Sequence, residues 1–161
     1  MGRIAHRLAC LLLGGLAWAA QAVEGPRPFV VGSLKEIQAQ YAGKPLIVTF
    51  WSVGCTHCPA ELKTLGVLKR RHPDLNIVLV AADTPDDGPE TRRLATQYGL
   101  AKAPQWVFAD PIPERLRMDI DRRWYGELPR THFYDAGHRL EAVSGVVPEA
   151  RLRQWVAANR R

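Results

Sequence analysis

The chain has 161 residues, of which 47% are hydrophobic and 24% are charged, with 13 glycines and 12 prolines. A chain of this length forms one domain with a core of ordinary size, and this composition excludes collagen-like, disordered and coiled-coil proteins. The formal charge of +6 indicates an anionic partner only if the basic residues cluster. Three cysteines are too few for a disulfide-rich scaffold, so any cysteine that matters is expected to act chemically.

Residues 1–22 have the pattern of a secretory signal peptide. Arg3 and Arg7 supply the positive charge, residues 8–20 form an apolar run, and Ala20-Gln21-Ala22 fits the small-x-small cleavage rule. A membrane-spanning helix needs about 20 residues, so this run is short for one, and an uncleaved membrane anchor is the alternative. Cleavage would lower the formal charge from +6 to +4, because two arginines and no acidic residue would leave.

The patterns of residues 23–161 predict an α/β domain. Residues 23–32 carry two prolines and two glycines and are typical of a loose lead-in, so the folded domain is expected to span 33–161. In chain order we expect a helix at 34–41, a strand at 46–51, a helix at 59–71, a strand at 76–82, a helix at 89–98, a strand at 105–108, a helix at 113–125, a hairpin of 131–134 with 139–143, and a helix at 148–159. The strands at 46–51 and 76–82 are uninterrupted apolar runs, which indicates burial on both faces. These elements predict a mixed central sheet of four or five strands flanked by helices.

Basic residues between 113 and 130 alternate with acidic ones, as on a solvated helix face. The residues concerned are Arg115, Arg117, Arg122, Arg123 and Arg130, with Glu114, Asp119 and Asp121 among them. No aromatic–basic platform and no nucleic-acid motif accompanies them, so the sequence predicts no nucleic-acid partner.

Cys55-Thr56-His57-Cys58 lies between a predicted buried strand and a predicted helix. Signal cleavage would remove Cys10, so in an exported chain Cys55 and Cys58 can pair only with each other unless the chain dimerises. Unpaired amide hydrogens make a helix start electropositive, which stabilises a thiolate, the nucleophilic form of cysteine. Cysteines three residues apart at a helix start lie on one face and close enough to bridge. We therefore expect Cys55, at the loop tip, to attack a partner disulfide and Cys58 to resolve the mixed disulfide.

Other uses of the Cys-x-x-Cys segment compete with redox chemistry. A purely structural disulfide would constrain the unfolded chain only weakly, because the loop that it closes is short. A c-type haem site needs a histidine directly after the second cysteine, where this chain has Pro59. A metal site built on the segment lacks an evident fourth ligand unless His132 or His138 supplies it. Two soft thiolates also suit Cu(I), which makes a Cu(I)-delivery protein an alternative of a different class.

The segment 50–61, Phe-Trp-Ser-Val-Gly-Cys-Thr-His-Cys-Pro-Ala-Glu, resembles the active-site segment of thioredoxin-like proteins, and most of all that of the exported TlpA/ResA type. Residues 128–133, Leu-Pro-Arg-Thr-His-Phe, followed by Asp-Ala-Gly at 135–137 and Gly145, are similar to the segment that carries the cis-proline loop in that family. The resemblance runs from about Leu46 to the C-terminus and implies a thioredoxin-like fold. It also implies that Pro129 is cis and packs against the dithiol, with Leu128 beside it and the backbone there pairing with a partner peptide. The residues alone would equally allow a trans proline at the first position of a strand.

The chain departs from the family pattern at several positions. Thr49 stands where thioredoxin has a buried aspartate, and Gly54 stands where a tryptophan usually precedes the first cysteine. Asp83 lies near a position where ResA-type proteins have an acid, but we expect it to be a solvated turn residue. Glu61 follows the second cysteine by three, as is common in the family, and we expect it to be an exposed helix residue.

His57 bears on the direction of electron flow. A histidine at this position also occurs in DsbA-type oxidases, where it helps to hold the thiolate and so makes the protein more oxidising. The TlpA/ResA resemblance covers more of the chain and favours a specialised periplasmic reductase of the cytochrome c or oxidase assembly type. We therefore expect a thiol–disulfide oxidoreductase that acts on protein thiols and disulfides and receives electrons from a membrane donor, with Thr56 and His57 tuning its potential. We expect a monomer that needs no metal or organic cofactor, and a DsbA-like oxidase is the alternative.

Overall fold

The computed structural model describes residues 25–159, and the predicted signal peptide lies outside them. The described residues form six strands, five α-helices and one short 3₁₀ helix. None of these helices is long and apolar enough to cross a membrane. The elements in chain order are β1 (Arg27–Phe29), α1 (Ser33–Gln40), β2 (Leu46–Trp51), α2 (Cys58–Arg71), β3 (Asn76–Ala81), η1 (Pro85–Asp87), α3 (Gly88–Gln97), β4 (Gln105–Phe108), α4 (Pro113–Ile120), β5 (Arg130–Tyr134), β6 (Leu140–Ser144) and α5 (Glu149–Asn159).

The strands form one mixed sheet in the order β1-β4-β3-β2-β5-β6. The neighbours β1–β4, β4–β3 and β3–β2 are parallel, whereas β2–β5 and β5–β6 are antiparallel. The predicted fold class, a mixed sheet flanked by helices, is therefore confirmed. The sheet has six strands rather than four or five, because three residues of the predicted lead-in pair with β4 as the edge strand β1.

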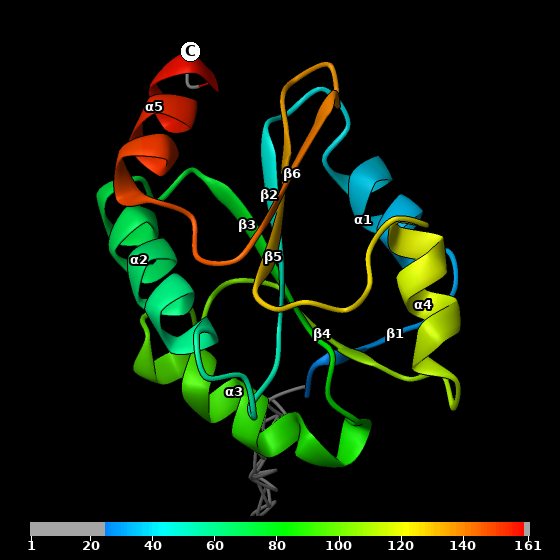
Figure 1. Ribbon diagram of the computed structural model, residues 1–161. Coiled ribbons are helices and arrows are strands. Elements are labelled where there is room, and N and C mark those ends of the chain that lie inside the picture. Colours follow the sequence, from blue (N-terminus) through cyan, green and yellow to red (C-terminus); the bar gives the residue numbers. More distant parts are fainter. Residues whose placement is uncertain (1–24, 160–161) are drawn as a thin grey trace, which may run out of the picture.

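Helices cover both faces of this sheet (Figure 1). Successive residues of β2 point to opposite faces, and the whole strand is buried, as its uninterrupted apolar pattern predicts. On one face, Ile47 belongs to a core that includes residues of α2, α3 and α5. On the other face, Val48 belongs to a core that includes residues of α1 and α4. The central strand β2 thus joins two separate apolar cores, and its carboxyl end leads directly into the Cys-x-x-Cys segment.

Helix α2 approaches the chain after α3 at a glycine. A Cβ atom added to Gly66 would lie 1.7 Å from the carbonyl oxygen of Tyr98, so no side chain fits there without a shift of backbone. The missing side chain lets α2 lie directly against this turn.

Helix α4 is shorter than the sequence predicts. It ends at Ile120, because Asp121 has extended backbone angles (φ −160°, ψ 118°), and residues 121–129 form a loop that leads into β5. Arg130 was expected on a solvated helix face with the neighbouring arginines, and this expectation is wrong. It is the first residue of β5, and it is only 8% exposed.

Candidate functional site

The two cysteines lie where β2 gives way to α2. Residues 52–57 connect the two elements, and Cys58 is the first residue of α2, with Pro59 in the first turn. Cys55 and Cys58 form a disulfide with an S–S distance of 2.10 Å and a Cα–Cα distance of 5.4 Å. The backbone N–H of Cys58 donates a hydrogen bond to the Cys55 sulfur at 3.1 Å. An N–H of a helix start therefore points at the sulfur of Cys55, where it would stabilise negative charge.

The two sulfur-bearing residues differ in their access to solvent. Cys58 is completely buried in the core under α2, whereas Cys55 is only partly buried. Cys55 lines a shallow cavity of about 490 Å³ together with the exposed residues Thr56 and His57 and the half-buried Leu128, and Ser52 and Gly54 complete its lining. An incoming group can therefore reach Cys55 from this cavity, but not Cys58.

The Leu128–Pro129 peptide bond is cis, as the family resemblance implies. Pro129 is buried, and its carbonyl oxygen accepts a hydrogen bond from the backbone N–H of Gly145 at 2.8 Å. Leu128 lines the cavity beside Cys55, although it lies 73 positions later in the chain. The structure thus places four of the six predicted site residues around one cavity, whereas Cys58, bonded to Cys55, and Pro129, next to Leu128 in the chain, are buried.

Asp83 holds the loop that carries Cys55, which differs from the solvated turn residue that we expected. One carboxylate oxygen accepts hydrogen bonds from the Ser52 hydroxyl at 2.8 Å and from the Val53 N–H at 3.2 Å, and the other oxygen accepts from the same N–H at 3.0 Å. The carboxyl is half-buried, and this burial raises its pKa. Asp83 therefore connects the end of β3 to the first residues of the Cys-x-x-Cys loop.

Glu61 is not the exposed helix residue that the sequence predicts, because its side chain is completely buried. Its carboxylate accepts hydrogen bonds from the Thr131 hydroxyl at 2.9 Å and from the Val147 N–H at 2.8 Å. Burial raises the pKa of this carboxyl, although the two hydrogen bonds oppose the shift. Glu61 lies three residues after Cys58 on α2, so both point from the same face of the helix into the core.

One further buried polar group near the dithiol was not predicted. The indole Nε1 of Trp51, the last residue of β2, is the sole buried side-chain nitrogen or oxygen without a hydrogen-bond partner among residues 25–159. Nothing in the sequence distinguishes it from a tryptophan that packs only through its ring.

The histidines considered as metal ligands are engaged elsewhere. His132 is completely buried and accepts a hydrogen bond from the Arg130 Nε at 3.1 Å, and His138 is hydrogen-bonded to the backbone carbonyl of Tyr41 at 2.9 Å. Within the described part of the chain, no group of three or more histidine, cysteine, aspartate or glutamate side chains is placed to hold a metal ion.

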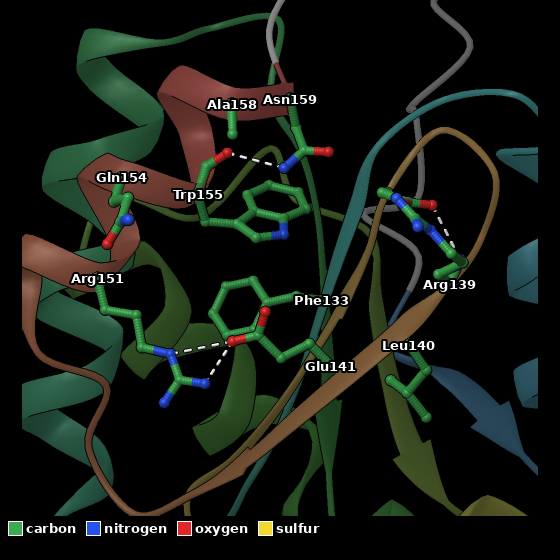
Figure 2. A pocket seen from close by; sticks show the side chains of 10 residues that line it. Phe133, Arg139, Leu140, Glu141, Arg151, Gln154, Trp155, Ala158 and Asn159 are labelled. Atoms are coloured by element: carbon green, nitrogen blue, oxygen red, sulfur yellow. Dashed lines mark hydrogen bonds and ion pairs between the residues drawn. The ribbon is translucent and has the colours of Figure 1, made fainter.

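A larger cavity of about 680 Å³ shares no residue with the dithiol cavity (Figure 2). It lies between α5 and the β5–β6 hairpin, with the rings of Phe133 and Trp155 in it and an ion pair between Arg151 and Glu141 at its side. None of the predicted site residues contributes to this cavity.

Comparisons with known proteins find similarity to this chain in sequence over part of its length and in fold. No protein-family model matches the chain. The sequence is 32% identical over 105 residues to a protein disulfide-isomerase of Oryctolagus cuniculus, a match that covers 63% of this chain and 19% of that protein. The chain therefore spans about a fifth of the length of this relative.

Several solved structures share the fold. One is a secreted disulfide oxidoreductase of Mycobacterium tuberculosis that is homologous to DsbE of E. coli, with a TM-score of 0.61, 24% identity, and coverage of 74% of this chain and 85% of that one. The DsbF protein of M. tuberculosis has a TM-score of 0.59 and 22% identity over 74% of this chain and 83% of its own. A thioredoxin-family thiol:disulfide interchange protein of Chlorobium tepidum has a TM-score of 0.59 and 19% identity over 76% and 83%. The chain therefore shares the fold of these three proteins, one of which is a thioredoxin-family protein.

Proposed function

We propose that this chain is an exported thiol–disulfide oxidoreductase that exchanges disulfides with other proteins through Cys55 and Cys58. The observation that carries the proposal is the asymmetry of the disulfide, since one sulfur-bearing residue lines an open cavity and the other is completely buried. This is the arrangement that ordered attack and resolution require, because a partner can reach only Cys55. The disulfide oxidoreductases and the disulfide-isomerase to which the chain is similar support the same chemistry.

In the reducing direction, the Cys55 thiolate attacks one sulfur of a partner disulfide. That disulfide breaks, a mixed disulfide forms between Cys55 and the partner, and the other partner sulfur leaves as a thiolate that takes up a proton. The Cys58 thiolate then attacks the Cys55 sulfur, which forms the intramolecular disulfide and releases the second partner thiolate. Two electrons pass from the dithiol to the partner, and the structure corresponds to the oxidised product.

Glu61 is the acidic residue of α2 that we propose as the acceptor of the Cys58 proton. Cys58 is buried, so bulk water cannot take up its proton directly. Glu61 lies one turn further along the same helix face, and burial raises the pKa of its carboxyl toward the working range of a general base. We therefore assign Glu61 the proton transfer that accompanies resolution, while Asp83 positions the loop of Cys55.

The direction that we favour is that of a specialised periplasmic reductase of the cytochrome c or oxidase assembly type. Its support is the similarity to a secreted oxidoreductase that is homologous to DsbE, together with the predicted signal peptide. Such a protein would draw its electrons from a membrane donor. The exposed His57 and Thr56 would adjust the stability of the Cys55 thiolate, and Leu128 with Pro129 would form part of the surface that receives the partner.

Two matched serine variants test the proposed order of attack. In Cys58→Ser the mixed disulfide cannot be resolved, so covalent complexes with partner proteins should accumulate and disappear on treatment with dithiothreitol. In Cys55→Ser the remaining thiol is buried, and few or no complexes should form. Equal trapping by the two variants, or no trapping by Cys58→Ser together with no insulin reduction or oxidation by the wild type, would overturn the proposal.

The redox state in the cell tests the favoured direction. A reductase supplied by a membrane donor should be largely reduced, as judged by alkylation of the free thiols with a mass tag after acid quenching. A largely oxidised pool would establish the DsbA-like direction instead. Loss of the reduced form on removal of the membrane electron supply would identify the source of the electrons.

A further inference from the structure

We propose that residues 122–128 form a recognition loop for an extended partner segment that has an apolar side chain near its reacting cysteine and acidic residues beside it. The inference rests on the proposed function and specifies which part of a partner the site receives. Its basis is the way the chain between α4 and β5 is anchored, and which side chains that anchoring leaves exposed beside the dithiol cavity.

The guanidinium of Arg130 fixes both ends of the loop. Its Nη2 donates to the Asp121 carboxylate at 2.5 Å, and its Nη1 donates to the Glu127 carboxylate at 3.2 Å and to the Ser144 hydroxyl at 2.8 Å. Its Nε donates to the ring of His132. Because Arg130 follows Pro129 directly and is almost completely buried, this cluster connects the loop to the cis-proline and to β6.

The middle of the loop holds a buried aromatic residue that is followed directly by an exposed one. Trp124 is 5% exposed, and its indole N–H donates to the Glu127 carbonyl at 2.9 Å. The next residue, Tyr125, is 92% exposed, which makes it the most exposed of the large apolar residues in the described chain. The chain turns at Gly126, which has a φ of 94°. A buried anchor beside an exposed ring is an arrangement that presents the ring at a fixed place.

Tyr125 is within reach of a peptide bound at the cavity. It precedes Leu128 by three residues, so the two Cα atoms are at most about 11 Å apart, and Leu128 lines the cavity with Cys55. A partner segment in extended conformation covers this distance with three or four residues. We infer that a bound partner segment contacts both the exposed ring of Tyr125 and the cavity-lining Leu128, two side chains that are together called the apolar strip. Aromatic rings of this kind dominate the energetics of protein interfaces.

The charge next to this strip is positive. Arg130 pairs with both Asp121 and Glu127, and together with the guanidinium groups of Arg122 and Arg123 these five side chains carry a net charge of +1, three cations less two carboxylates. Arg123 is 91% exposed and has only a long contact of 3.8 Å to Asp121, and the exposed Arg122 has no ion-pair partner in the described chain. Acidic residues of a partner would meet these two guanidinium groups, which is why we assign the loop a segment with an acidic flank.

The test uses synthetic peptides in which one cysteine is linked by a disulfide to thionitrobenzoate. Attack by reduced Cys55 on the peptide sulfur releases the coloured thionitrobenzoate, and resolution by Cys58 then releases the peptide thiol and leaves the protein disulfide. Four peptides combine leucine or serine three residues from the cysteine with glutamates or lysines beyond it. The small uncharged disulfide 2,2′-dithiodipyridine reports the reactivity of Cys55 without recognition.

The wild type should react about tenfold faster with the leucine peptide than with the serine peptide, since tenfold corresponds to partial burial of one apolar side chain. The glutamate peptides should react faster than the lysine peptides, and added salt should reduce this difference. Tyr125→Ser should abolish the leucine preference, and Arg122→Ser with Arg123→Ser should abolish the charge preference. All variants should react with the small disulfide at the wild-type rate.

Two exposed residues of α4 provide matched controls. Met118 is 62% exposed and apolar, and Arg115 is exposed and basic, but both lie before the loop. Met118→Ser and Arg115→Ser should retain the preferences of the wild type. Loss of preference in the controls as well, or an unchanged preference in Tyr125→Ser, would overturn the inference. Failure to react with the small disulfide would instead overturn the proposed function.

Discussion

The two residues that follow the cis-proline point to opposite faces of the sheet, and each takes part in a buried charged group with different partners. Thr131 points toward α2 and donates to the Glu61 carboxylate, whose partners are a hydroxyl and a backbone N–H and include no cation. Arg130 points to the other face, where two carboxylates flank its guanidinium. The comparison shows that burial alone does not set the pKa of a charged group, because the hydrogen-bond and ion-pair partners also contribute.

The pKa shifts of the two faces follow from these partners. On the α2 face, burial raises the pKa of Glu61, and no nearby cation cancels the effect. On the α4 face, the backbone N–H of Arg123, aided by the charge of Arg130, lowers the pKa of Asp121. The pKa of a carboxyl is therefore raised on the first face and lowered on the second.

The largest effect is expected from Arg130→Met, which leaves the carboxylates of Asp121 and Glu127 beside a buried apolar side chain. Removing one partner of a buried ion pair costs roughly 3 kcal/mol or more, so the free energy of unfolding measured in urea should fall by about that amount. Arg139→Met is the matched control, because Arg139 is 90% exposed and pairs with Asp135 on the surface. It should lose less than about 1 kcal/mol. Similar losses in both variants would contradict a special role for the α4 face.

A second effect depends on pH and comes from His132, which lies with Arg130 on the α4 face. Burial, followed by the charge of Arg130, lowers the pKa of His132 from 6.5 to about 4. The unfolded chain therefore binds a proton that the folded chain rejects, so the free energy of unfolding should fall as the pH drops from 6.5 to 4, by up to roughly 3 kcal/mol. His132→Phe should be less stable at neutral pH but should lose less on acidification. An unchanged slope of unfolding free energy against pH would refute this cause.

The smallest effect is expected from Glu61→Gln, and it has the opposite sign with pH. Because the folded state raises the pKa of Glu61, the protonated carboxyl is favoured by folding, and its contribution is lost as the pH rises from 4.5 through the folded pKa. The wild type should therefore lose stability relative to Glu61→Gln over that range in urea titrations. Glu114→Gln, at an exposed position of α4, is the matched control for replacing a carboxylate by an amide.

Glu61→Gln also separates proton transfer from stability. Glutamine retains the size of the side chain but cannot accept a proton, so resolution of a mixed disulfide by Cys58 should slow while the first attack by Cys55 does not change. Stopped-flow measurement of the two phases with dithiobis(nitrobenzoate) checks this expectation. Equal slowing of both phases would assign Glu61 a purely structural part.

The central part of the fold could be predicted from the sequence because its signals are local. The apolar runs of β2 and β3 have no alternation, and the start of α2 has a proline in its first turn, so all three elements were expected within a residue of their observed bounds. The strand β1 was missed because three residues carry no periodicity, and only its pairing with β4 makes it a strand.

The buried charges could not be predicted in the same way, because their partners come from distant segments. Glu61 receives its hydrogen bonds from residues 70 and 86 positions away. One signal could have found it, since it follows Cys58 by three and precedes Leu65 by four, which places it on the buried stripe of α2. For Arg130 the alternation of charges between 113 and 130 was misleading, because a loop that wraps one guanidinium and a solvated helix have the same local composition.

The missing side chain of Gly66 has a consequence for the electron exchange itself. Cys58 is the first residue of α2, and two turns later Gly66 of the same helix lies against the carbonyl oxygen of Tyr98, where a Cβ atom does not fit. A side chain at position 66 would displace α2, the helix that carries the resolving Cys58. Gly66→Ala should therefore alter the rate at which the disulfide forms, although the added methyl group lies two turns from Cys58. The rate of disulfide closure is thus expected to depend on the contact between α2 and the turn after α3, which shares no residue with the dithiol cavity.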